Sequence, residues 1–239
     1  MKTVAIIQAR MGSTRLPGKV LKLLNGEPML SRVVKRVRRA AGVDEVLIAT
    51  TTEPRDDALT DLCAREGWPC FRGSEHDVLD RYYLAAKEAR ATVVVRITAD
   101  CPLIDPGIAS SVIEGLELQG SDYCSNVFPR TYPRGLDVEA FTFAALETAW
   151  REDGNLAWRE HVTQFIVRQP ERFAMSNLTG DEDYSALRWT VDTPEDFAFA
   201  EKVCAHFPND DFSWEDVLAV LAQHPDWAAL NQHIEQKTI

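Results

Sequence analysis

The chain has 239 residues, enough for one large domain, and its hydrophobic fraction of 45% and charged fraction of 26% are typical of globular proteins. Acidic residues outnumber basic ones by 37 to 26, and the net charge of −11 argues against a general nucleic-acid binder. No apolar stretch approaches the roughly 20 residues that span a bilayer, and the apolar run after Met1 is too short for a signal peptide. The five cysteines are odd in number and form no C-x-x-C pair, which favours reduced thiols in a cytoplasmic protein.

Apolar runs alternate with helical patterns through the first half of the chain. The runs are rich in β-branched residues, and the helical patterns place apolar residues three and four positions apart. This alternation predicts an α/β fold with a mostly parallel sheet that is covered on both faces. We expect strands over residues 3–8, 45–51, 92–98 and near 121–126, and helices over 28–40, 56–67, 75–90 and 107–118.

The second half is less regular and opens with a loop-like segment at 126–135. It contains no linker, repeat or low-complexity segment, so we expect residues 1–239 to form one domain. The predicted strands lie over 136–141, near 173–178 and over 188–193, and the predicted helices over 141–152, 156–168, 194–206 and from 213 onward.

The loop after the first strand, QARMGSTRLPGK (8–19), concentrates positive charge. Arg10, Arg15 and Lys19 can hold phosphate oxygens by charge-assisted hydrogen bonds. The residues between them offer close backbone approach and further donors: Gly12, Ser13 and Thr14. The loop is neither a Walker A motif, because five residues separate Gly12 from Gly18, nor a G-x-G-x-x-G fingerprint. The alternative interpretation is a solvated loop held by surface ion pairs.

Two aspartates come at the predicted ends of strands. Asp100 lies in TADCP and Asp192 in VDTPED. Ligands of open parallel sheets bind beyond the carboxyl ends of the strands, so both aspartates and the cationic loop can converge on one cleft. Two carboxylates sharing one Mg²⁺ beside phosphates would suit this arrangement. Taken alone, each aspartate would more often be a turn or helix-capping carboxylate than a metal ligand.

Other candidates have two interpretations each. His161 in REHVTQF falls inside a helical pattern and is more readily a packed or surface histidine than a base. Arg134, Asp137 and Glu139 belong either to a binding loop or to a solvated turn. For Cys101, next to Asp100, we expect the role of a small buried thiol.

These motifs resemble a known family. IIQARMGSTRLPGKVL is similar to the N-terminal signature of the sugar-acid cytidylyltransferases. RGSEHDVLDRYY, RITADCPLIDP, SNVFPRTYPRGLDVEAF, REHVTQFI and WTVDTPEDF follow in the order found in the SpsF branch, named for spore-coat polysaccharide biosynthesis. The resemblance covers residues 3 to 206.

The resemblance implies a nucleotide-diphospho-sugar transferase fold (GT-A-like), a Rossmann-like three-layer sandwich with a mostly parallel mixed sheet. It also implies a Mg²⁺-dependent reaction in which a hydroxyl of a small sugar-like acceptor attacks the α-phosphorus of CTP, giving a CMP conjugate and pyrophosphate. The nucleotide would occupy the half over about 1–120, and the half over 121–239 would serve the acceptor and a homodimer contact through loop 126–135. No nucleic acid or membrane partner is implied.

The family pattern also carries residue roles onto this sequence. Arg10, Ser13, Arg15 and Lys19 match the triphosphate loop, and Asp100 and Asp192 match the metal-binding aspartates. Among these, Lys19, Arg15, Asp100 and Asp192 are the expected catalytic residues. Gly12 and Thr14 complete the nucleotide loop, and Arg72 with the neighbouring Ser74 would lie near the nucleotide base.

Two departures from the pattern leave the acceptor open. Thr98 stands where better-known members have Gln, and Thr190 replaces the first aspartate of the D-x-D found in sialic-acid enzymes. The segment that recognises the acceptor in the KDO enzymes has no counterpart in this sequence. The alternative functions are a glycosyltransferase with a nucleotide-sugar donor and a nucleotide-binding homologue without catalysis.

Overall fold

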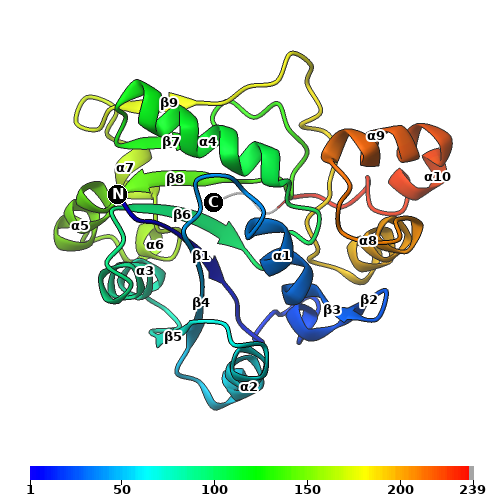
Figure 1. Cartoon of the computed structure of the whole chain (residues 1–239), viewed down its shortest axis with the longest axis horizontal. Helices are drawn as coiled ribbons and strands as arrows, with labels where there is room; N and C mark the ends of the chain where they lie inside the picture. The colour runs from blue at the N-terminus through cyan, green and yellow to red at the C-terminus, as the bar shows by residue number, and fades with distance from the viewer. Residues whose placement is uncertain (237–239) are drawn as a thin grey trace.

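A seven-stranded sheet forms the centre of the computed structural model, which describes residues 1–236 (Figure 1). The strand order is β5-β4-β1-β6-β8-β7-β9, and β8 runs antiparallel to its neighbours β6 and β7. The strands are β1 (Thr3–Gln8), β4 (Glu45–Thr51), β5 (Cys70–Gly73), β6 (Val93–Thr98), β7 (Tyr123–Ser125), β8 (Glu139–Thr142) and β9 (Met175–Asn177). A small separate hairpin pairs β2 (Leu23–Leu24) with β3 (Glu27–Pro28).

Helices cover both faces of this sheet. One apolar core contains side chains of α1 (Met29–Val37), α2 (Asp57–Glu66), α4 (Pro106–Gln119), α8 (Pro194–His206) and α9 (Trp214–Gln223). The core on the opposite face contains side chains of α3 (Val78–Glu88), α5 (Phe143–Glu152) and α7 (Gln164–Val167). The short helices α6 (Leu156–Arg159) and α10 (Pro225–Ala228) complete the set with the 3₁₀ turns η1 (Lys19–Leu21) and η2 (Pro54–Asp56). Figure 1 shows α8, α9 and α10 gathered on the opposite side of the sheet from α5.

Burial on both faces explains the continuous apolar runs in the sequence. Successive side chains of a strand point to opposite faces. In β1, Ala5 and Ile7 therefore enter one core, and Val4 and Ile6 enter the other. The predicted α/β fold with a mostly parallel sheet covered on both faces is confirmed.

The pairing register brings the ends of the central strands level with one another. Gln8, the last residue of β1, pairs with Thr98, the last residue of β6, and on its other side with Ala49 of β4. The loop after β1 and the segment after β6 consequently leave the sheet side by side, at its carboxyl edge.

Most predicted elements are confirmed within one to three residues, but two are wrong. The helix predicted over 156–168 is interrupted between α6 and α7, where Val162 has a φ of 61°, a conformation that ends a right-handed helix. The strand predicted over 188–193 is a single bridge between Arg188 and Arg134, because the chain then turns away to hydrogen-bond the Asp100 carbonyl through the Val191 amide at 2.8 Å. Strand β5 and the β2–β3 hairpin were not predicted.

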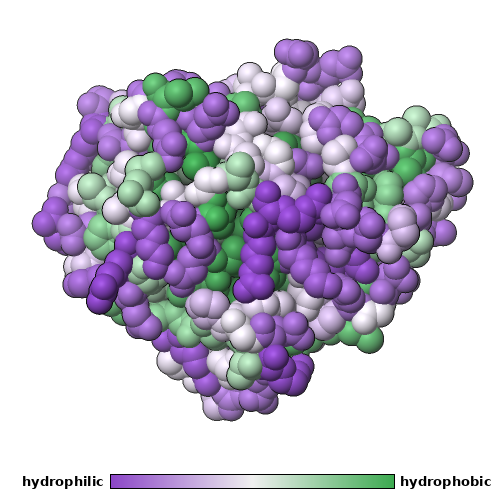
Figure 2. Space-filling model, viewed as in Figure 1, coloured by the Kyte–Doolittle hydropathy of each residue, from purple (hydrophilic) through white to green (hydrophobic). Residues whose placement is uncertain are grey.

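Figure 2 shows hydrophilic residues over most of one face, with apolar residues confined to separate patches. None of the helices within residues 1–236 has both the length and the apolar character that crossing a membrane requires.

Candidate active site

The loop after β1 folds back on itself and is anchored to Asp56 at the end of the 3₁₀ turn η2. The Met11 carbonyl accepts hydrogen bonds from the amides of Ser13 (2.9 Å) and Gly18 (3.1 Å). Gly18 adopts a φ of 68°, a left-handed conformation that glycine tolerates without strain. The Met11 amide donates to Asp56 at 2.7 Å, and Asp56 is fully buried. The loop is therefore held in one shape by backbone contacts, which leaves its cationic side chains available for other partners.

Lys19 brings the two predicted aspartates together. Its Nζ donates to Asp100 Oδ2 (2.9 Å), to Asp192 Oδ1 (2.9 Å) and to the Val191 carbonyl (2.7 Å). An ammonium has three donors, and all three are used here. The side chain is only 9% exposed, so its charge lies between the two carboxylates rather than in solvent. This contact joins residues 81 and 173 positions apart in the sequence.

The second oxygen of Asp192 is held by two guanidinium groups. Arg15 lies 3.0 Å from Asp192 Oδ2, and Arg188 Nη2 donates to the same oxygen at 2.9 Å. Arg188 also pairs through Nε with Asp196 Oδ1 at 2.9 Å. Asp196 and Thr193 form the capping box of α8, so the capping role belongs to them and not to Asp192.

The charges in this cluster stabilise one another against burial. Burial favours the neutral form of Asp100, but the Lys19 ammonium outweighs it, so the pKa of Asp100 lies below its ordinary value. Burial likewise acts to lower the pKa of Lys19, and the two carboxylates overcome it and raise that pKa. The Lys19 ammonium and the Asp100 carboxylate thus stabilise each other's charged forms.

The cluster forms part of the wall of a cavity of about 340 Å³, which we call the main cleft. Eight of the ten predicted site residues line it: Arg10, Gly12, Ser13, Thr14, Arg15, Lys19, Asp100 and Asp192. The predicted convergence of the cationic loop with the two aspartates is therefore present in the structure. Asp192 arrives there from an extended segment and not from the end of a strand.

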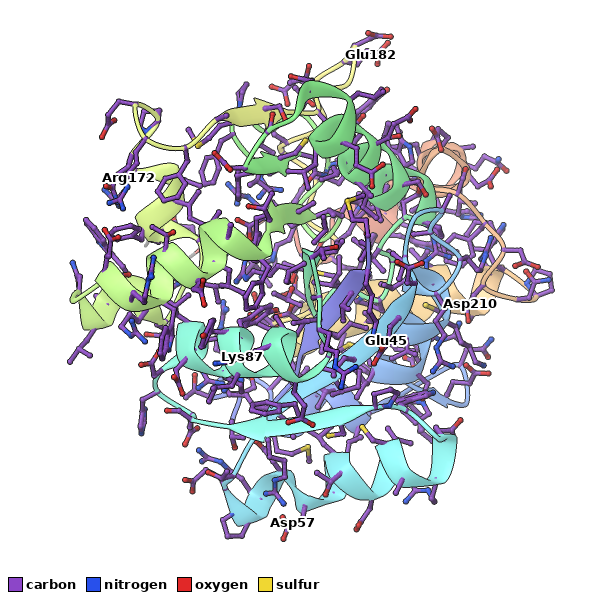
Figure 3. The ribbon with its side chains drawn as sticks, turned by 60° about the vertical axis from the view of Figure 1, so that its left-hand side comes forward. Glu45, Asp57, Lys87, Arg172, Glu182 and Asp210 are labelled. Atoms are coloured by element: carbon purple, nitrogen blue, oxygen red, sulfur yellow. The ribbon has the colours of Figure 1, made fainter. Side chains whose placement is uncertain are left out.

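Arg72 and Ser74 do not line the main cleft. The Arg72 guanidinium donates to the Thr51 and Glu53 carbonyls at 2.9 and 3.1 Å and pairs with Asp57, at the periphery of the molecule on α2 (Figure 3). Ser74 Oγ accepts a hydrogen bond from the Asp77 amide just before α3. A role for either residue near a base stays a prediction.

The segment over 132–141 is not a solvated turn throughout. Glu139 is 6% exposed, pairs with Arg96, and accepts hydrogen bonds from Tyr123 and Thr163 at 2.7 Å each. Asp137 binds the Arg130 guanidinium through both oxygens, at 2.5 and 2.7 Å.

His161 and Cys101 lie close to the candidate site. His161 is partly buried, which lowers the pKa of its imidazole, and it lines a small cavity next to the main cleft. Cys101 is a buried thiol, as expected.

Several residues of the site were missed from the sequence. Arg188 looked like part of a strand, and Asn231 lies in the C-terminal tail, yet Asn231 Nδ2 donates to Asp196 Oδ1 and to the Arg188 carbonyl at 2.9 Å each. Glu160 lines the main cleft. The sequence offers one signal for this network: Asp196 lies three residues after Thr193, the spacing of a capping box.

The carboxylates of Asp100 and Asp192 provide a donor set that fits a small divalent cation. Their side chains are 26% and 15% exposed, so oxygens of both remain accessible from the cleft. Magnesium uses one or two protein carboxylates and completes its shell with water and phosphate oxygens. Residues 1–236 contain no group of three or more His, Cys, Asp or Glu side chains arranged to bind one metal ion.

Comparison with known proteins identifies the chain. The sequence model of the cytidylyltransferase family matches residues 4–237. The spore coat polysaccharide biosynthesis protein SpsF of Bacillus subtilis is 35% identical, covering 93% of this chain and 95% of its own length. A solved cytidylyltransferase of Leptospira borgpetersenii superposes with a TM-score of 0.91 at 33% identity and covers all of both chains.

A more distant solved structure extends the likeness to the fold alone. CMP:2-keto-3-deoxy-manno-octonic acid synthetase, solved in complex with CTP, gives a TM-score of 0.60 at 22% identity, covering 86% of this chain and 98% of that one. The fold is accordingly that of the nucleotide-sugar transferase-like nucleotidyltransferases, as the sequence motifs implied. With its family signature, its central sheet and its full-length relatives in agreement, the chain belongs to the cytidylyltransferase family.

Proposed function

We propose that this enzyme is a Mg²⁺-dependent cytidylyltransferase that transfers CMP from CTP to a hydroxyl of a sugar-acid-like acceptor, with release of pyrophosphate. The product would be an activated donor for surface polysaccharide. The observation that carries the proposal is the Lys19 bridge between Asp100 and Asp192, in a cleft that Arg10 and Arg15 also line. A triphosphate needs several cationic partners, and this cleft offers three from one loop.

The residues of the cleft suit nucleotidyl transfer because such reactions depend on positioning and on neutralising charge. Arg10 and Arg15 would bind the phosphate oxygens, and Lys19 would add its positive charge beside them to offset the charge that develops on pyrophosphate as it leaves. Asp100 and Asp192 would hold Mg²⁺, which supplies polarisation of the α-phosphate and screening of its charge. No protein nucleophile is required, in keeping with a cleft that is lined by charged and small residues.

The proposed reaction is tested by measuring pyrophosphate release from CTP, ATP, GTP and UTP with a panel of 2-keto sugar acids. We expect release with CTP and at least one acceptor, and calorimetric binding of CTP in preference to ATP and GTP. Binding of a nucleotide sugar with transfer of its sugar would instead identify a glycosyltransferase. CTP binding without turnover under any condition would leave a nucleotide-binding homologue.

We also expect a homodimer that forms through loop 126–135. Phe128 in this loop is 56% exposed and, with Met175 of β9, lines an apolar surface pocket. Sedimentation at micromolar concentration would detect the dimer, and a monomer for the wild type would refute it.

A further inference from the structure

A second, smaller cavity opens beside the main cleft. It has a volume of about 170 Å³, and we call it the side cavity. Its polar lining comes from Gln8, Arg10, Arg81, Arg96, Glu160 and His161. None of the residues assigned above to the phosphates and the metal contributes to it except Arg10. At about 30 Å³ for each water of liquid volume, the space holds on the order of six waters, which is ample for a carboxylate or phosphate group.

Three buried polar atoms of this lining have no hydrogen-bond partner. They are Gln8 Oε1, Arg81 Nε and Arg96 Nε, half of the six such side-chain atoms found in the described residues. Leaving a buried polar atom unsatisfied costs about 1–3 kcal/mol, so native proteins rarely gather such atoms at one place without a ligand. Here one acceptor and two cationic donors belong to residues around a single small space.

The charge of Arg81 is the strongest indication of what fills that space. Arg81 is 2% exposed, and its Nη1 donates to the Ser74 carbonyl at 2.6 Å. Within residues 1–236 no carboxylate lies within ion-pair distance of its guanidinium, whereas Arg96 is paired with Glu139 and Arg10 lies 3.7 Å from Glu75. Burial of this cation outweighs the more distant carboxylates of Asp56 and Glu75 and lowers the pKa of Arg81. A buried cation with no carboxylate in contact is unfavourable.

An anion satisfies these groups better than a neutral ring. A neutral base could accept hydrogen bonds from the two guanidinium groups but would leave Arg81 without an anion in contact. An oxyanion offers two or more acceptor oxygens and the missing charge together. The partner of Gln8 Oε1 would then be a donor next to the anion, such as a hydroxyl on the adjacent carbon.

The side cavity shares part of its lining with the main cleft, in which the proposed reaction would take place. Gln8, Ala9, Arg10 and Glu160 line both cavities, so one molecule can extend from the first into the second. An anion held in the side cavity would leave the rest of the acceptor directed toward Lys19, Asp100 and Asp192.

We infer that the side cavity is an oxyanion subsite, in which Arg81 and Arg96 bind a carboxylate or phosphate group of the acceptor and Gln8 binds a neighbouring hydroxyl. The assignment of that anion to the acceptor rests on the proposed cytidylyl transfer. The subsite itself rests on the burial, the charge and the unsatisfied atoms of these three residues.

The test observes the arginine side chains directly, without turnover. The Nε–Hε signals of Arg81 and Arg96 are followed by ¹H–¹⁵N NMR during titration with glycolate, with methyl phosphate, and with glycolamide as a neutral isostere of glycolate. We expect saturable shifts of both signals with at least one of the two anions and none with glycolamide or sodium chloride. Stronger binding of glycolate identifies a carboxylate subsite, and stronger binding of methyl phosphate identifies a phosphate subsite.

Variants separate binding at the site from general effects. Arg81→Gln is expected to weaken anion binding roughly tenfold or more, while Arg65→Gln, on the exposed surface of α2, leaves it unchanged. Equal shifts with glycolamide, no saturable shift with either anion, or unchanged binding in Arg81→Gln would overturn the subsite. The wild-type titration decides the question even if Arg81→Gln does not fold. Anion binding without CTP-dependent pyrophosphate release would refute the proposed function and leave the subsite standing.

Discussion

Arg188 and Asp192 form an ion pair of 2.9 Å, although the segment between them is extended and not helical. Arg188 holds Asp192 Oδ2 while Lys19 holds Oδ1, so the carboxylate is fixed at both oxygens. The same guanidinium is held in place by Asp196, which is fully buried. The orientation of one cleft carboxylate thus depends on a network that extends into the start of α8.

Lys19→Ala should strongly reduce the release of pyrophosphate from CTP. The substitution removes the cation shared by Asp100 and Asp192 and leaves two carboxylates facing the phosphates. Pyrophosphate release should fall roughly 10²-fold or more, as when charged contacts to a transition state are lost. Lys19→Arg should restore it only in part, because a planar guanidinium cannot direct donors at the same three acceptors. Lys22→Ala, on an exposed residue of the same region, serves as the control. Wild-type kinetics in Lys19→Ala would mean that the loop is only a solvated surface.

Asp100→Asn and Asp192→Asn should each weaken the response to Mg²⁺. Each change removes one negative charge with little change in size, so metal–CTP binding and the chemical step should suffer, and metal-free CTP binding should persist or improve. The double variant should be little worse than either single one, because both residues would act through one ion. Single-turnover rates across a Mg²⁺ titration measure this. Additive losses, or a normal Mg²⁺ dependence in either single variant, would contradict a shared site.

Asp196→Asn should lower the stability at neutral pH and matter less in acid. Burial favours the neutral form of Asp196, but hydrogen bonds from Arg188, the Asp192 amide and Asn231 outweigh it and hold its pKa below the ordinary 3.8. For a carboxylate whose pKa is lowered by folding, the stabilisation is complete above the unfolded pKa and is lost as the pH falls through the folded one. The free energy of unfolding should drop by on the order of 2 kcal/mol near neutral pH. Urea denaturation of both proteins should show this gap closing below pH 3.8, and a constant gap would count against the explanation.

Gly135→Ala should destabilise the protein and loosen the cleft. Gly135 has a φ of 106°, and an added Cβ would lie 2.5 Å from the Thr190 amide nitrogen. The backbone conformation alone should cost on the order of 2 kcal/mol, and the segment that carries Asp192 would also have to shift. Gly154→Ala has no atom within 4 Å of its Cβ and should be nearly neutral. Thermal unfolding of the two variants tests the difference, and equal melting temperatures would refute it.

The features that could be predicted from the sequence are those that depend on local residue patterns. Buried strands, helix periodicity and the density of cations after β1 are all visible within short windows, and the level ends of β1 and β6 follow from a parallel sheet. Contacts between distant segments are not visible in this way. The β-branched residues of 188–193 resemble a strand, but their position is decided by Gly135, Asp100 and Asn231 from three other parts of the chain. The side cavity was likewise invisible, because Gln8, Arg81 and Arg96 lie on three different elements.

The reach of Asn231 into this network has a consequence for the order of folding. The hydrogen bonds from Asn231 fix Arg188 and Asp196, and these in turn hold Asp192 against Lys19 of the first loop. The cleft thereby joins the loop after β1 to Asn231, and contacts of such long sequence separation form slowly because the entropy of loop closure opposes them. Because a chain is synthesised from its N-terminus, the loop after β1 is present long before Asn231 is added. If the proposed function holds, the ability to bind a triphosphate would therefore appear only after Asn231 has joined this network.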